Sequence, residues 1–185
     1  MSGPQPPEIY GFSLNSAYSE KVFWGTFNMN RIYWVFAFLV LFGGSALACP
    51  DYSKSGDTYE LTGADLYSVH QYNVRAGGNI NIEKCSNVVP QTDRGRGYVT
   101  EAPDFTFNLS GMGKYTLTVS VESDCDSVLL VNTASAGWYY DDDDNGNLDA
   151  KVNLTRPSDG WLDVWVGTHD GAVCDAMLSM ETFDR

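Results

Sequence analysis

Hydrophobic and polar residues alternate with a period of two in the middle of the chain. Residues 105–109 carry phenylalanine or leucine at every second position, and residues 115–121 alternate apolar residues with threonine and serine. Because successive side chains of a β-strand point to opposite faces, both segments are predicted to be half-buried strands. The glycines and serine of residues 110–113 supply turn residues between them, which predicts an antiparallel hairpin.

The same pattern predicts six further strands, over residues 66–74, 80–85, 127–132, 138–140, 162–167 and 176–182. In the last of these, Ala176, Leu178 and Met180 are expected to face the core. Gly, Asp, Asn and Pro residues separate the strands, and residues 91–97 are expected to form an exposed loop. No segment shows sustained helical periodicity. The predicted fold is therefore all-β, a two-sheet antiparallel β-sandwich of jelly-roll-like type.

The first 48 residues have a different character. Arg31 precedes an apolar run and then small residues ending at Ala48, which is the pattern of a secretory signal peptide. The run is shorter than the roughly 20 residues of a membrane-spanning helix, so no integral membrane segment is expected in the mature chain. Residues 1–28 are either a mis-assigned extension before a start at Met29 or a long leading region. The predicted organisation is a signal peptide at 29–48 and a single domain at 49–185, secreted or periplasmic.

All four cysteines follow the expected cleavage site: Cys49, Cys85, Cys125 and Cys174. An even number of cysteines in an exported chain is typical of disulfides, and four cysteines allow three pairings. Pairing Cys49 with Cys85 and Cys125 with Cys174 is favoured, because it gives each half of the domain one cross-link. Lipidation of Cys49 would leave one thiol unpaired and is the less favoured alternative.

The net charge of the chain limits the classes of partner that it is expected to bind. The formal net charge is −13, and residues 1–48 hold two acidic and two basic residues, so the whole charge lies in residues 49–185. An acidic domain is a poor ligand for nucleic acid or for an anionic membrane surface. The expected partner is a protein or a surface polymer.

An acidic loop, residues 141–149, places oxygen-bearing side chains on alternate positions around a glycine, as calcium-binding loops do. The candidate ligands are Asp141, Asp143, Asn145, Asn147 and Asp149, with Asp124 and Asp126 as further candidates from a neighbouring loop. The acid that closes an EF-hand at its twelfth position is missing, because Val152 stands there. The alternative is a solvated hairpin tip without metal, since Asn145-Gly146 alone favours a tight turn.

Several of these segments together resemble a known family. Residues 121–132, Gly137-Trp138, the acidic loop and residues 163–168 are similar to pre-peptidase C-terminal domains. The ending, residues 174–183, is similar to the closing strand of exported alphaproteobacterial proteins labelled as peptidases. The resemblance spans residues 101–183 and implies a β-sandwich that assists secretion, stability or substrate binding without being catalytic.

Catalytic residues are sparse in residues 49–185. His70 and His169 supply the imidazoles, and neither lies in a recognisable catalytic motif. Both are expected to be ordinary surface histidines. The chain is therefore predicted not to be an enzyme, and a peptidase-associated enzyme is the lowest-ranked hypothesis.

Tryptophans provide the one hint of a ligand surface. Trp161 and Trp165 share strand parity with Asp163, so at least one of them is expected on the outer face. Exposed tryptophans stack on sugar rings, although tryptophans of a small sandwich, Trp138 included, are often packing residues. The leading hypothesis is a protein-interacting binding or stability module, with a carbohydrate-binding or extracellular-matrix-binding domain as the alternative.

Overall fold

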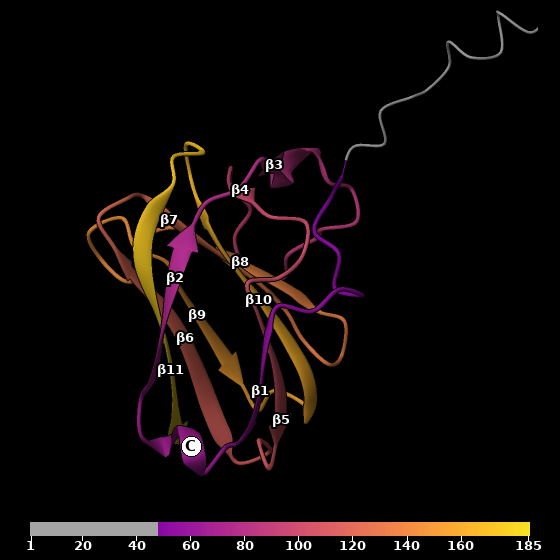
Figure 1. Cartoon of the computed structure of the whole chain (residues 1–185). Coiled ribbons are helices and arrows are strands. Elements are labelled where there is room, and N and C mark those ends of the chain that lie inside the picture. The colour runs from indigo at the N-terminus through magenta and orange to yellow at the C-terminus, as the bar shows by residue number, and fades with distance from the viewer. Residues whose placement is uncertain (1–47) are drawn as a thin grey trace, which may run out of the picture. The chain divides into compact units, whose positions relative to one another are not determined.

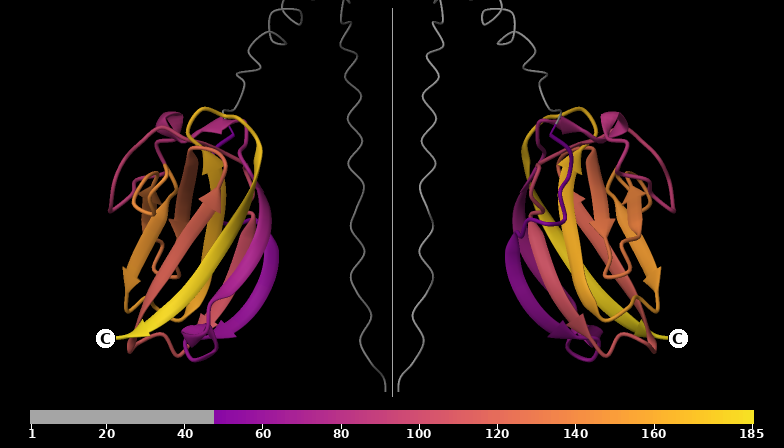
Figure 2. Two further views of the ribbon diagram at one scale, coloured as in Figure 1. Left: turned by 90° about the vertical axis from the view of Figure 1, so that its left-hand side faces the viewer. Right: turned by 90° about the vertical axis from the view of Figure 1, so that its right-hand side faces the viewer.

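The computed structural model describes residues 48–185, which form two β-sheets packed face to face (Figures 1 and 2). This confirms the predicted all-β sandwich. The predicted extension and nearly all of the signal peptide lie outside the described residues. No helix within the described residues has the length and apolar character needed to cross a membrane.

The strands divide between the sheets as follows. The seven-stranded sheet contains β1 (Asp57–Thr62), β3 (Ile80–Asn81), β4 (Tyr98–Val99), β5 (Phe105–Ser110), β7 (Ser127–Asn132), β8 (Trp138–Asp141) and β10 (Gly160–Thr168). The four-stranded sheet contains β2 (His70–Ala76), β6 (Tyr115–Ser123), β9 (Lys151–Thr155) and β11 (Cys174–Asp184), in the order β2-β11-β6-β9. Two short 3-10 helices are η2 (Asp65–Tyr67) and η3 (Ile82–Lys84).

Strand β10 is central to the larger sheet. It pairs antiparallel with β5 through its first half and with β7 through its second half, on opposite edges. Its last residue pairs with β4. Beyond β5, strand β1 pairs in parallel, so the sandwich is not antiparallel throughout.

The predicted hairpin between residues 105–109 and 115–121 is wrong. Both segments are strands, but β5 belongs to the larger sheet and β6 to the smaller one. The turn at residues 111–114 therefore carries the chain from one sheet to the other. Alternation records which face of a strand is buried, and both strands bury a face in the same core, so the pattern could not identify the pairing partner.

Several predicted boundaries also differ. The strand expected at 66–74 begins at His70, because Leu66 is buried in η2, and the strand expected at 80–85 stops at Asn81, where η3 begins. The Asn81 side chain accepts a hydrogen bond from the Glu83 N–H and caps that helix. Strands β1, β4 and β9 lie outside all the predicted strands.

The main hydrophobic core lies between the sheets. Strand β11 contributes Ala176, Leu178 and Met180, as predicted, while the residues between them are partly exposed. Strand β10 contributes Leu162, Val164 and Val166 from the opposite sheet.

A second hydrophobic cluster covers part of the outer face of the seven-stranded sheet. Its buried members are Ile82, Val99, Val128, Leu130, Trp138, Tyr140 and Trp165, with Val88 packed against them. Trp165 alternates along β10 with the residues of the main core, so this cluster lies on the other face of the strand. The segment from η3 to β4 covers it, and only the remainder of the outer face is left open.

Both disulfides have the favoured pairing. Cys49 joins Cys85, with their Cα atoms 5.6 Å apart, and Cys125 joins Cys174, with their Cα atoms 6.4 Å apart. The first ties the start of the domain to the end of η3, and the second ties the β6–β7 turn to the start of β11. All four cysteines are therefore bonded.

Asp104 links three strands at the start of β5. Its carboxylate accepts the Val166 N–H at 2.7 Å, and its backbone bonds to Val164 and Asp57. Burial raises the pKa of this carboxyl to about 6, against the lowering effect of the Val166 hydrogen bond. The charged form is thus disfavoured in the folded protein.

We expect Asp104→Asn to stabilise the protein at pH 7 by about 1–2 kcal/mol and to leave it unchanged near pH 4. A carboxyl whose pKa is raised by folding contributes stability below its unfolded pKa of about 4, and this is lost as the pH rises through about 6. Asparagine keeps the acceptor oxygen without the charge. Urea denaturation from pH 4 to pH 7 measures the effect, with the exposed Glu60→Gln on β1 as control. An Asp104→Asn variant that is less stable at pH 7 contradicts the prediction.

Candidate functional site

The acidic loop begins with a buried carboxylate. Asp141, at the end of β8, is 3% exposed, and its Oδ2 accepts the N–H groups of Asp144 at 3.0 Å and Lys151 at 2.7 Å. Burial raises the pKa of Asp141, and these two hydrogen bonds lower it. Asp141 thus holds the two arms of the loop together.

The far end of the loop faces strands β6 and β7. Asp149 is also buried, and its Oδ1 accepts hydrogen bonds from the hydroxyls of Ser123 at 3.0 Å and Ser127 at 3.1 Å. The side-chain amide of Asn145 donates to the Val121 carbonyl at 2.8 Å. Residues 146–148 all have positive φ, and this left-handed turn directs Asp149 back to the strands.

The predicted calcium ligands are therefore not brought together as a set. Asn145 and Asp149 use their side chains to fasten the loop to the sandwich. Among the described residues, the acidic side chains that converge are Asp93, Asp141 and Asp144, whose ligand atoms lie within 4.8 Å of one another. This acidic triad consists of carboxylate oxygens, which are the ligands that calcium prefers, so it could hold such an ion.

Asp93 was missed by sequence reasoning. It lies in the loop over residues 91–97, which is largely exposed, as predicted. The loop is held against β8 by Thr92, whose hydroxyl donates to the Tyr140 carbonyl at 2.7 Å and accepts the Tyr140 N–H at 2.9 Å. No local pattern around Asp93 signals this contact, because it joins segments distant in the chain.

The other candidate acids have different partners. The Asp126 carboxylate lies 3.7 Å from His169 Nδ1, and the Asp126 carbonyl accepts the His169 N–H. Asp124 is exposed and is not part of the triad. His70 lies on β2 in the four-stranded sheet, whereas His169 directly follows β10 of the seven-stranded sheet.

The three tryptophans of residues 48–185 have different environments. Trp165 is fully buried and Trp138 is 6% exposed, and their ring centroids lie 5.3 Å apart in the second hydrophobic cluster. The expectation that Trp165 forms a ligand surface is therefore wrong. It faces outward from β10, as its parity indicates, but other side chains cover it. Trp161 is 52% exposed and remains a candidate.

A hollow of about 580 Å³ lies beside Trp161, on the uncovered part of the outer face, and we call it the outer-face hollow. Its lining consists of Tyr52, Ser53, Lys54, Ser55, Thr106, Asn132, Thr133, Ala134, Ala136, Asp159, Gly160, Trp161 and Asp163. The volume falls within the range of roughly 300–1,000 Å³ that is typical of small-ligand sites. Burial raises the pKa of Asp163, and the Thr106 hydroxyl that donates to it lowers that pKa.

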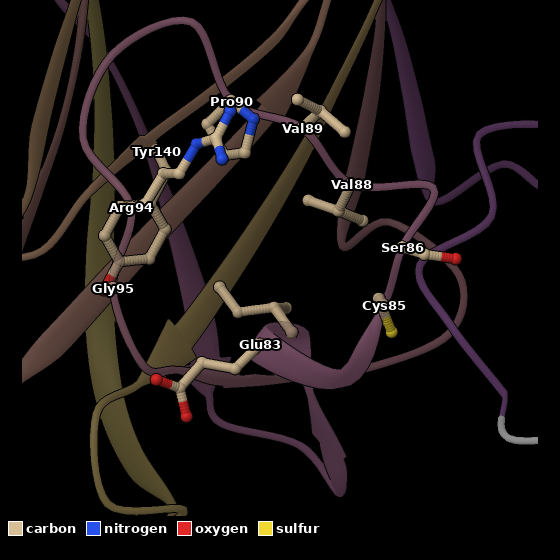
Figure 3. Close-up of a pocket in the computed structure, with 10 residues that line it drawn as sticks. Glu83, Cys85, Ser86, Val88, Val89, Pro90, Arg94, Gly95 and Tyr140 are labelled. Atoms are coloured by element: carbon tan, nitrogen blue, oxygen red, sulfur yellow. The ribbon is translucent and has the colours of Figure 1, made fainter.

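A second pocket, of about 430 Å³, lies under the segment from η3 to residue 95 (Figure 3). Its lining combines apolar residues, among them Ile82, Val88 and Pro90, with the polar or charged residues Glu83, Ser86 and Arg94. The Tyr140 hydroxyl donates to the Arg96 carbonyl at 2.8 Å, so its polar atom is already bonded. This pocket extends the second hydrophobic cluster, to which Ile82 and Tyr140 belong.

The geometry defines an all-β, disulfide-bonded sandwich with an acidic triad and an outer-face hollow. No protein-family model matches the chain, and no curated protein matches it. Among solved structures it is similar to PliG from Aeromonas hydrophila, a periplasmic inhibitor of g-type lysozyme, with 12% identity and a TM-score of 0.41 over 70% of this chain and 99% of that one. It is similar to the same degree to the pre-peptidase C-terminal domain of a Bacillus anthracis collagenase, with 12% identity and a TM-score of 0.41 over 71% of this chain and 99% of that one. Both likenesses are distant.

Replacing Asp149 with alanine is expected to destabilise the domain by about 1–3 kcal/mol. The Ser123 and Ser127 hydroxyls would lose their common acceptor, and Ser127 is fully buried. Thermal unfolding of the oxidised protein measures the effect. Asp143→Ala is the control, because Asp143 is an exposed acid of the same loop. Equal melting temperatures for the two variants would show that the serine contacts do not hold the loop.

Proposed function

We propose that residues 49–185 form an exported, non-catalytic binding module of pre-peptidase C-terminal type, with a protein or a surface polymer as its partner. The observation that carries the proposal is the outer-face hollow, where the exposed Trp161 stands beside the buried polar residues Asn132 and Asp163. A soluble sandwich gains no stability from leaving a large indole in water next to polar groups, whereas a binding site needs that combination.

Two disulfides support export. Such bonds persist in oxidising compartments, outside the cytoplasm, and both link elements of the folded domain. The signal-peptide pattern before Cys49 points the same way. The module is thus assigned to the periplasm or the extracellular space.

The arrangement of reactive side chains supports binding rather than catalysis. All four cysteines are in disulfides, so none is available as a thiolate nucleophile. His169 faces the Asp126 carboxylate, and His70 lies in the other sheet. The polar side chains of the outer-face hollow carry amide, hydroxyl and carboxylate groups, together with the Lys54 ammonium, which is paired with Glu101. Such groups suit recognition by hydrogen bonds.

Calcium is proposed as a structural ion at the acidic triad. Asp93, Asp141 and Asp144 come from two loops, and an ion shared by their carboxylates would tie the loop over residues 91–97 to the end of β8. Three clustered carboxylates repel one another, and a divalent cation relieves that repulsion. Its role would be to stiffen this end of the sandwich.

We expect excess calcium to raise the melting temperature of the mature protein and a chelator to reverse the rise, because an ion that binds only the folded state stabilises it. Asp93→Asn and Asp144→Asn should each abolish most of the rise. Asp143→Asn should preserve it, since Asp143 is exposed and lies outside the triad. Calorimetry measures all four proteins. A calcium effect that depends on Asp143 and not on Asp93 would restore the ligand set expected from the sequence.

We expect immobilised mature protein to retain material from the cell envelope of the organism that encodes it, and Trp161→Ala to reduce retention by about tenfold or more. Phe183→Ala is the matched control, because Phe183 is an aromatic of similar exposure, 47%, at the end of β11. Separate portions of the envelope material are treated with protease or with periodate before retention is measured. Loss after protease indicates a protein partner, and loss after periodate indicates a polysaccharide. Retention no greater than that of an unrelated domain of equal charge would refute the proposal.

A further inference from the structure

Three polar side chains form one row across the outer-face hollow. Asp163 on β10 lies directly opposite Thr106 on β5 and directly opposite Asn132 on β7. All three are at most 5% exposed. Side chains directly opposite each other in a sheet have Cβ atoms about 4.5–5.5 Å apart, so the row is compact. A buried polar row on the outer face of a sheet is unusual, since such groups normally face water.

Thr106 fixes one end of this row. Its hydroxyl accepts the Gly56 N–H at 3.1 Å and donates to Asp163 Oδ1 at 2.7 Å. The threonine is therefore satisfied by protein groups, and it orients the Asp163 carboxylate. Asp163 is held in place as a hydrogen-bond acceptor.

Asn132, at the other end, is not satisfied. Its Nδ2 is the one buried side-chain nitrogen or oxygen without a hydrogen-bond partner among the described residues. Buried polar groups in folded proteins are normally paired, because leaving one unpaired costs free energy. Asn132 lines the outer-face hollow. Its Nδ2 is itself buried, so a turn of the amide about the last side-chain bond would present this donor to an acceptor atom of a ligand there.

An indole borders the row. Trp161 precedes Asp163 by two residues in β10 and so lies on the same face, with about half of its side chain exposed. Tyr52, 54% exposed, belongs to the same lining. An exposed indole beside a row of hydrogen-bonding groups offers stacking and polar contacts to one small ring.

The charge of the lining excludes anionic ligands. Asp159 and Asp163 are acidic, and the one cation of the lining, Lys54, is paired with Glu101 at 2.7 Å. A phosphate or carboxylate would meet net negative charge. An ammonium group could pair with Asp163 and the indole, but it has only donors and would leave the Asn132 Nδ2 unsatisfied. A hydroxyl both donates and accepts, so neighbouring hydroxyls could serve Asp163 and Asn132 together.

We propose that the outer-face hollow binds a neutral sugar residue of a glycan, with the ring stacked on Trp161, one hydroxyl donating to Asp163 and one accepting from Asn132 Nδ2. This inference rests on the proposed binding function and names its ligand as a polysaccharide rather than a protein. It assigns Asn132 to recognition, at a position where its side-chain nitrogen has no partner among the described residues.

The test uses the mature protein, Cys49–Arg185, which contains both hydrophobic clusters and both disulfides. The probes are methyl glycosides of common neutral and N-acetylated sugars, with their β-linked oligomers, and an oligolysine peptide as the competing class. Nitrogen-15 NMR follows the side-chain amide of Asn132, and tryptophan fluorescence follows Trp161. We expect at least one sugar to shift both signals and oligolysine to shift neither.

Variants separate recognition from folding. Asn132→Leu and Trp161→Ala should each weaken sugar binding by about tenfold or more, while Asn132→Leu keeps or raises the melting temperature. Asn73→Leu, the same change at an exposed position of β2, is the control and should leave binding unchanged. Trp161→Tyr should restore part of the affinity lost in Trp161→Ala.

The outcomes are distinguishable. Two results overturn the sugar assignment but leave the proposed binding module intact. One is binding of oligolysine that depends on Asp163. The other is a protein that responds to no sugar but still retains envelope material through Trp161. Loss of envelope retention as well overturns both. Sugar binding that is unaffected by Asn132→Leu also overturns the assignment, because the unpaired amide is its basis.

Discussion

Strand β10 is buried on both faces from Leu162 to Thr168, and the elements around it are arranged to cover both faces. One face supplies Leu162, Val164 and Val166 to the core between the sheets, and the other places Trp165 in a second cluster. The second cluster needs a cover, which the segment from η3 to β4 provides. Since that cover spans only part of the outer face, the remainder is left open at Trp161 and Asp163. The hollow therefore exists because the second cluster does not extend to the start of β10.

The two disulfides join segments that are far apart in the chain. Cys49–Cys85 anchors the start of the domain beside η3, and Cys125–Cys174 joins the turn after β6 to the start of β11. The paired cysteines are separated by 36 and 49 residues in the sequence. In the chain-entropy model each disulfide restricts the unfolded chain and so stabilises the folded domain by roughly 3–4 kcal/mol. A small oxidised domain can use this stabilisation in place of a larger core.

Acidic residues have two distinct structural uses in this domain. Asp149 and Asp163 are buried and accept hydrogen bonds from serine or threonine hydroxyls, so each organises its surroundings through neutral donors. Asp93 and Asp144 are exposed and converge on the buried Asp141. The buried carboxylates stabilise the fold and shape the outer-face hollow. The acidic triad concentrates negative charge at the end of β8. The net charge does not reveal this division, because it does not distinguish carboxylates that accept hydrogen bonds from those that do not.

Local alternation, residue type and spacing were enough to predict the fold class, the faces of β10 and β11 that point to the core, the presence of two disulfides and the acidic loop. The sequence by itself did not determine that β5 and β6 lie in different sheets, that Asp93 joins Asp141, or that Trp165 is covered while Trp161 is open. Each of these depends on contacts between segments far apart in the chain, and a period of two identifies a buried face without identifying what buries it. Only the tertiary structure placed Asn132 beside Asp163 and left its amide without a partner.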